Sequence, residues 1–138
     1  MTPTVELRLA RLPGFLGRIA AHYWLVDRTN PETPVRWEIW QDPDVRGESW
    51  GHLHKNLKSP ADGVGNGGSW VEVTWHDRPA DEILGVLRTI SESYPARFRY
   101  WSWPGPNSNT FVQWVLLKAG TNHQLGPMAL GATFAHML

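Results

Sequence analysis

The sequence predicts an α+β fold in which a small antiparallel sheet packs on two main helices. Three observations carry this prediction: apolar runs of strand-forming residues, two stretches with helical periodicity, and turn-forming segments between them. At 138 residues the chain has the length of one domain with one sizeable core. We therefore expect a single α+β domain over residues 1–138.

The first part of the chain is predicted to supply most of the sheet. Val5, Leu7 and Leu9 alternate with polar residues, which indicates a short strand or an extended edge segment. Residues 19–26, IAAHYWLV, form an apolar run typical of a central strand, and residues 35–40, VRWEIW, indicate a second strand. Because the segment between them is rich in Asn, Pro and Thr, the two runs predict an antiparallel hairpin with a long loop.

The middle of the chain is predicted to leave the sheet and return to it. Residues 41–68 are rich in Gly, Pro and Asp, which indicates an ordered excursion over the surface with little regular secondary structure. Residues 70–75, WVEVTW, alternate as a third strand, and residues 96–103, ARFRYWSW, alternate as a further short one.

The first main helix is predicted over residues 77–94. Asp77 is a candidate N-cap, and Tyr94-Pro95 ends the helical pattern. Apolar residues recur at helical spacing and are expected to form the buried stripe: Ile83, Leu84, Leu87 and Ile90.

The second main helix is predicted to begin at Asn107 or Ser108 and to run to Lys118, with Gly120 ending it. Its inner side is expected to carry Phe111, Val112, Val115 and Leu116. The apolar tail, residues 124–138, is expected to add one more strand or to pack as a closing segment.

Composition narrows the classes of function. Thirteen basic and thirteen acidic residues cancel, and no sustained basic run is present, so we expect no nucleic-acid partner. The chain has no cysteine, and neither a signal peptide nor a membrane span is indicated, so a cytoplasmic protein is expected. His52 and His54 lack a third ligand at a convincing spacing, and we predict neither a metal nor a cofactor.

The residues around Ser108 form the candidate site. Free backbone N–H groups at a helix start favour an anion or an oxyanion, although Asn and Ser are also the residues that helices use simply as N-caps. Alternation places His22 and Trp24 on one face of their strand and Glu38 and Trp40 on one face of the next. If the hairpin pairs in register, Glu38 comes near the His22 ring, fixes its tautomer and raises the basicity of its other nitrogen.

These residues outline a nucleophile, a base and a group that orients the base: Ser108, His22 and Glu38. Aromatic side chains are expected to line the cleft: Trp24, Trp40, Trp101 and Trp103. Asn107 and Asn109 are added as candidate substrate-binding residues. Such a cleft would take a small molecule, a peptide, a glycan or a lipid-like acyl ligand.

Several blocks of the chain resemble, in the same order, an uncharacterised bacterial family called domain of unknown function 3750. The blocks are AAHYWLV, VRWEIW, SYP, YWSWPGPNSNTF and LGPMALG, and together they span most of residues 13–131. Residues 103–111 carry the most specific match. The chain departs from the family where Ala132 and Thr133 replace a Lys-Asp ending, and where Tyr23 stands in place of the usual Thr.

That family in turn resembles the circularly permuted papain-like proteins, which include NlpC-type peptidases, PPPDE-type isopeptidases and lecithin–retinol acyltransferase. The resemblance implies a histidine at His22, an orienting residue at Glu38 and a nucleophile at Ser108, where those proteins carry cysteine. Serine is compatible with a Ser-His-Glu hydrolase or acyltransferase acting on an amide or ester, and equally with an inactive module that keeps the cleft for binding. A third hypothesis is a structural domain in which PGPNSNTF is only a rigid turn and cap.

Overall fold

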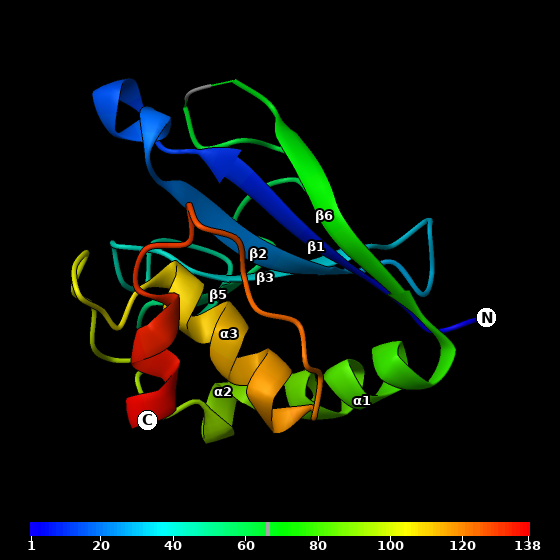
Figure 1. Cartoon of the computed structure of the whole chain (residues 1–138). Helices are drawn as coiled ribbons and strands as arrows, with labels where there is room; N and C mark the ends of the chain where they lie inside the picture. The colour runs from blue at the N-terminus through cyan, green and yellow to red at the C-terminus, as the bar shows by residue number, and fades with distance from the viewer. Residues whose placement is uncertain (66) are drawn as a thin grey trace.

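A computed structural model describes residues 1–65 and 67–138. It has an antiparallel sheet in the order β4-β5-β3-β2-β1-β6, with the main helices gathered on one side of it (Figure 1). The strands are β1 (Thr4–Arg11), β2 (Ala21–Asp27), β3 (Val35–Ile39), β4 (Glu48–Trp50), β5 (Leu53–Lys55) and β6 (Ser69–His76). The helices are α1 (Asp77–Leu87), α2 (Ile90–Ser93) and α3 (Ser108–Lys118), with short 3-10 helices η1 (Gly14–Arg18) and η2 (Ala132–Met137). The predicted α+β class, with a small antiparallel sheet on two main helices, is confirmed.

The predicted hairpin of residues 19–40 is present as β2 and β3. The two strands pair antiparallel, with Leu25 opposite Trp37 and Asp27 opposite Val35. The strand expected around Val5–Leu9 is β1, but it lies inside the sheet, between β2 and β6. Strand β6, which comes much later in the sequence, pairs with the outer edge of β1. The local pattern of β1 gives no sign of this pairing, so the sequence could not show that β1 is an inner strand.

Two predictions about strands were wrong. Residues 41–68 are not wholly irregular, because β4 and β5 form a tight hairpin there and β5 extends the sheet beyond β3. Residues 96–103 form a turn followed by irregular structure instead of a strand. Ala96 is buried and Tyr100 packs against the core, but Phe98, Trp101 and Trp103 are all exposed. The apolar alternation on its own is not enough to make a strand.

The helix predicted over residues 77–94 is broken in two. Thr89 leaves the helical conformation at φ −114° and ψ 13°, which separates α1 from α2. Asp77 does not cap α1 either: the N-cap position is His76, no side chain caps it, and Asp77 has a positive φ of 57°. Ile83, Leu87 and Ile90 are buried as predicted, whereas Leu84 is only partly buried.

Helix α3 has the predicted bounds and a well-defined end. The N–H of Gly120 donates to Leu117 O, and the N–H of Thr121 donates to Leu116 O, with Gly120 at φ +76°. This pair of bonds is the Schellman arrangement, which needs a residue that tolerates positive φ. Residues Ser108–Leu116 are all buried, because β2 and β3 lie along one side of α3 while α1 and η2 pack on others. The tail is the closing segment, with η2 against α3, and not a further strand.

The sheet has two different faces. The face toward the helices carries the main apolar core, including Leu7, Tyr23, Leu25 and Ile39 packed with Phe111 of α3. The opposite face carries a small apolar cluster around Trp24 and, beside it, buried polar residues. The segment between β5 and β6 covers that second face, since its carbonyls accept hydrogen bonds there. Among the described residues no helix is both long enough and apolar enough to cross a membrane.

Candidate functional site

The block Asn107-Ser108-Asn109-Thr110 fastens the start of α3 to three other segments. Asn107 Oδ1 accepts from the N–H groups of Asn109 and Thr110, while Thr110 Oγ1 accepts from the Asn107 N–H, which makes a capping box. The side-chain amide of Asn107 donates to Ser102 O and Leu130 O. The hydroxyl of Thr110 donates to Gly131 O at 2.7 Å.

Asn109 binds the two backbone neighbours of His22. Its Oδ1 accepts from the Tyr23 N–H at 3.0 Å, and its Nδ2 donates to Ala21 O at 2.9 Å. Strands β2 and β3 pair only along Leu25–Asp27, so this stretch of β2 has no bonds to β3. The Asn109 amide binds the backbone groups of β2 that a paired strand would otherwise bind, and so holds the first turn of α3 beside His22.

Two glycines allow this packing. A Cβ on Gly131, which has φ +94°, would overlap the side-chain amide of Asn107. A Cβ on Gly105, which has φ +126°, would lie 2.8 Å from Thr110 Oγ1. The glycines of Pro-Gly-Pro and of the tail therefore make room for the polar block, which explains why these distant motifs accompany Asn-Ser-Asn-Thr. The peptide bonds before Pro104 and Pro106 are both cis.

The expected contact between His22 and Glu38 is present. His22 Nε2 lies 2.6 Å from Glu38 Oε2, and Glu38 is completely buried. Arg36 holds the same carboxylate with two bonds, Nε to Oε1 at 2.8 Å and Nη2 to Oε2 at 2.9 Å. Burial raises the pKa of Glu38, but the hydrogen bonds and positive charge of His22 and Arg36 outweigh burial and hold that pKa at about 2.

Because the Glu38 carboxylate is ionised, it can only accept from His22. Nε2 of the neutral ring must therefore carry the proton, and Nδ1 is left as the basic nitrogen. Nδ1 makes no hydrogen bond within residues 1–65 and 67–138, and the ring lines a cavity. The neutral ring therefore has an unprotonated nitrogen with no partner among the described residues.

Arg36 is the residue that sequence reasoning missed. Its guanidinium is fully buried, lies 3.9 Å above the Trp24 ring and donates to Ser59 O and Asp62 O as well as to Glu38. The only signal in the sequence is that Arg36 and Glu38 are two apart and so share one face of a strand. The Ser59 and Asp62 carbonyls accept hydrogen bonds from the buried guanidinium and so offset the cost of burying its charge. They lie more than 20 residues away along the chain, and no local sequence pattern predicts them.

Ser108 and His22 line the same cavity, which has a volume of about 450 Å³. This volume lies within the range of small-molecule sites. The cavity wall is mostly apolar, with Leu12, Leu16, Ile39, Val64 and Leu130 among its residues, and Tyr100, Ser102 and Gln41 add polar groups. Ser108 Oγ is 3.4 Å from Asn109 Oδ1 and makes no hydrogen bond to His22 within the described part of the chain.

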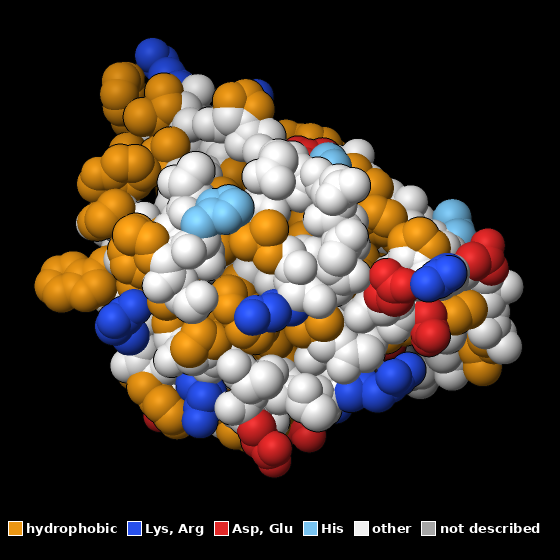
Figure 2. All heavy atoms as spheres, turned by 60° about the horizontal axis from the view of Figure 1, so that its bottom comes forward, with side chains coloured by type: hydrophobic (Ala, Val, Ile, Leu, Met, Phe, Trp, Pro, Cys, Tyr) orange, Lys and Arg blue, Asp and Glu red, His pale blue; other side chains and the backbone are white. Residues whose placement is uncertain are grey.

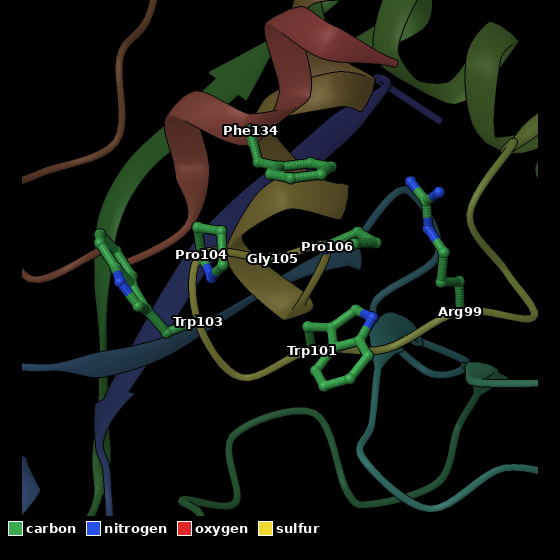
Figure 3. A pocket seen from close by; sticks show the side chains of 7 residues that line it. All are labelled: Arg99, Trp101, Trp103, Pro104, Gly105, Pro106 and Phe134. Atoms are coloured by element: carbon green, nitrogen blue, oxygen red, sulfur yellow. The ribbon is translucent and has the colours of Figure 1, made fainter.

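The predicted aromatic residues lie at different places. Trp40 and Trp103 line the main cavity. Trp24 does not, since it is buried beside the His22 ring and donates to Pro60 O. Trp101 lines a second hollow of about 290 Å³, which shares Trp103 with the main cavity. Figure 3 shows Phe134 on one side of the Pro104–Pro106 turn and Trp101 on the other.

The two asparagines have their hydrogen-bonding capacity used within the fold. Both side-chain amides of Asn107 and Asn109 donate to backbone carbonyls, and both Oδ1 atoms accept from N–H groups. The geometry gives them a positioning role, and we leave them out of the substrate contacts proposed below.

Three other histidines contact a backbone carbonyl or a carboxylate. His52 Nδ1 contacts Trp40 O at 2.9 Å, and His54 Nε2 contacts Asp42 O at 3.0 Å. His123 Nε2 pairs with Glu72 Oε2 at 2.6 Å, and the same carboxylate accepts from the Tyr23 hydroxyl. Within the described residues no group of three or more His, Asp or Glu side chains is arranged to hold a metal ion.

Comparison with known proteins identifies one family. The family model described as "Protein of unknown function (DUF3750)" matches residues 2–134, nearly the whole chain. No curated protein and no solved structure matches the chain. The match includes every residue of the His22–Glu38 pair, the Asn-Ser-Asn-Thr block and the Gly131 turn. The chain therefore belongs to the family of proteins of unknown function DUF3750.

Proposed function

We propose that this protein is a serine-dependent hydrolase or acyltransferase that acts on an amide or an ester. Ser108 is the nucleophile, His22 the general base and Glu38 the residue that orients His22. The observation that carries the proposal is the buried chain from Arg36 through Glu38 to His22, which ends at a basic nitrogen on the wall of the cavity that Ser108 also lines.

The chemistry follows from this order of groups. Ser108 Oγ attacks the substrate carbonyl carbon as His22 Nδ1 takes the hydroxyl proton. The bond to the leaving alcohol or amine then breaks, and His22 returns the proton to the leaving group. Water, or a second alcohol or amine, attacks the acyl-serine and gives its proton to His22, which passes it back to Ser108. Glu38 stays ionised throughout and stabilises the imidazolium, as its pKa of about 2 permits.

The start of α3 supplies a donor for the oxyanion. The N–H groups of Asn109 and Thr110 are taken by Asn107, but the Ser108 N–H makes no hydrogen bond within the described residues. This N–H sits at the positive end of the helix dipole, next to the reacting atom. The apolar wall from Leu12, Leu16, Ile39 and Trp40 favours an acyl group as the part of the substrate that enters the cavity.

Hydrolysis of p-nitrophenyl esters with acyl chains of increasing length tests the proposal. We expect turnover that rises with chain length until the cavity is filled, and that is lost in Ser108→Ala and His22→Ala. Turnover that survives both substitutions would exclude this site. Val45→Ala, an exposed change in the 41–47 loop, is the matched control and should keep full activity.

One observation favours a second candidate function. Ser108 Oγ contacts Asn109 Oδ1 and not His22, which is the arrangement of a serine that takes no part in chemistry. In that case the cavity binds an acyl, glycan or peptide ligand without altering it. Recovery of an unchanged ligand after binding, with no acyl-serine detected by mass spectrometry, would identify this module. The papain-like resemblance, with serine in place of cysteine, is compatible with either function.

A further inference from the structure

Large apolar side chains stand exposed on two segments that flank the mouth of the main cavity. Phe15, Leu16 and Ile19, in and after η1, are 75%, 55% and 58% exposed. Trp101 and Trp103, in the segment before α3, are 64% and 66% exposed. Leu16 and Trp103 line the main cavity from these two sides, and we call the five residues the apolar rim of its entrance.

The rim is wider than a binding cavity requires. Phe15, Ile19 and Trp101 do not line the main cavity, yet each leaves most of its side chain in water. A contiguous apolar patch beside a site marks an interaction surface. In Figure 2 hydrophobic side chains gather along the left of the view, the side on which η1 and the segment before α3 lie in Figure 1.

The charges beside the rim are positive and unneutralised. Arg18 stacks over Phe15 at 5.0 Å, Arg11 donates to Gly17 O of η1 at 2.9 Å, and Arg99 lines the hollow shared by Trp101 and Trp103. In the described part of the chain none of these three arginines pairs with a carboxylate. Most arginines elsewhere do: Arg8, Arg28, Arg36, Arg78 and Arg88 each have an acidic partner. With a net charge of zero, the protein therefore concentrates free positive charge next to its exposed aromatic groups.

We propose that the apolar rim docks this protein on an anionic lipid surface. Trp, Phe and Leu side chains partition into the headgroup and acyl boundary of a bilayer, and neighbouring arginines bind anionic headgroups. A protein partner would more often meet these arginines with carboxylates in a shaped interface. Two short projecting segments with apolar tips and flanking arginines instead suit a fluid surface. Docking in this orientation would turn the cavity mouth toward the lipid, and the supply of acyl substrate to Ser108 by this route rests on the proposed function.

Co-sedimentation with vesicles tests the docking without using the reaction. The protein carrying Ser108→Ala should bind vesicles made of equal parts phosphatidylglycerol and phosphatidylcholine, and should bind pure phosphatidylcholine weakly. Arg18→Gln should lower the partition coefficient about fivefold, as expected for one charge near an anionic surface. Arg78→Gln removes an equal charge from a 90% exposed side chain at the start of α1 and should change little. Phe15→Ser should weaken binding to both kinds of vesicle.

Three results would overturn the proposal. The first is that the protein does not sediment with anionic vesicles. The second is that Arg18→Gln and Arg78→Gln lower the vesicle partition coefficient equally. The third is self-association, measured by analytical ultracentrifugation, that Phe15→Ser abolishes. The last would show that the rim binds a second copy of the chain. Because Ser108 is absent from the tested protein, vesicle binding and catalysis succeed or fail separately.

Discussion

His22 Nε2 meets Glu38 Oε2 at 2.6 Å, although the register of the sheet sets Glu38 diagonally across from His22. The pairing ends at Leu25 and Trp37, and the same register carried one residue further would set Glu38 opposite Trp24. Arg36 holds the carboxylate from its other side, so Glu38 has one position that serves both partners. The base of the proposed reaction is thus oriented by a buried ion pair whose loss should be measurable in stability as well as in chemistry.

Replacing Glu38 tests this ion pair. Glu38→Gln leaves the buried Arg36 charge without its counterion, and we expect a loss of about 3 kcal/mol in the free energy of unfolding near neutral pH. The pKa of Glu38 is about 2 in the folded protein, below its ordinary value of 4.5. Its stabilising contribution is therefore complete above about pH 4.5 and is lost as the pH falls toward 2. Urea denaturation across this range should show a weaker pH dependence in the variant.

The matched control for that experiment is Glu48→Gln. Glu48 is 61% exposed and pairs with Lys55 at 3.3 Å, so its substitution should change stability by no more than about 0.5 kcal/mol. Equal effects of the two substitutions would mean that Glu38 is not held as described.

Asn109 should matter for position more than for contact with substrate. Asn109→Ala removes the side-chain partner of the Tyr23 N–H and of the Ala21 carbonyl and one of the two donors to the Leu130 carbonyl, and we expect a loss of roughly 2–4 kcal/mol in the free energy of unfolding. In NMR spectra the His22 ring signals should shift, because the first turn of α3 loses its attachment to β2. Asn109→Ala with wild-type stability and unchanged His22 signals would contradict the positioning role.

Ser108→Cys tests the electrostatics of the helix start. The chain has no cysteine of its own, so an introduced thiol can be followed without background. The free N–H of residue 108, the positive end of the α3 dipole and the nearby His22 favour a thiolate, and iodoacetamide at neutral pH should alkylate Ser108→Cys about tenfold or more faster than an unactivated thiol. Ser102→Cys, on the wall of the same cavity but outside the helix, is the control. Similar rates for the two variants would show that the site does not activate a nucleophile.

The local patterns predicted what depends on neighbouring residues. A few consecutive side chains were enough to predict strand β2, strand β3 and the start of α3 at Asn107. The contact between His22 and Glu38 could be expected because the two strands form a hairpin. Residues 96–103 do not form the predicted strand because a strand also needs a neighbouring strand to pair with. Among the described residues, the β4–β5 hairpin gives this segment a single backbone hydrogen bond, from the His52 N–H to Arg97 O. The burial of Arg36 and the hydrogen bonds of Asn109 to the backbone of β2 could not be predicted from the sequence, because their partners lie far along the chain.

The central claim is that His22 activates Ser108, and covalent labelling with a fluorophosphonate tests it most directly. A serine activated by a general base attacks the phosphorus and keeps the label, whereas an unactivated serine does not react. We expect the native protein to be labelled at Ser108, identified by mass spectrometry of the modified peptide, and labelling to disappear in both Ser108→Ala and His22→Ala. A folded native protein that takes up no label, or one whose Ser108 is labelled equally well in His22→Ala, would contradict the account.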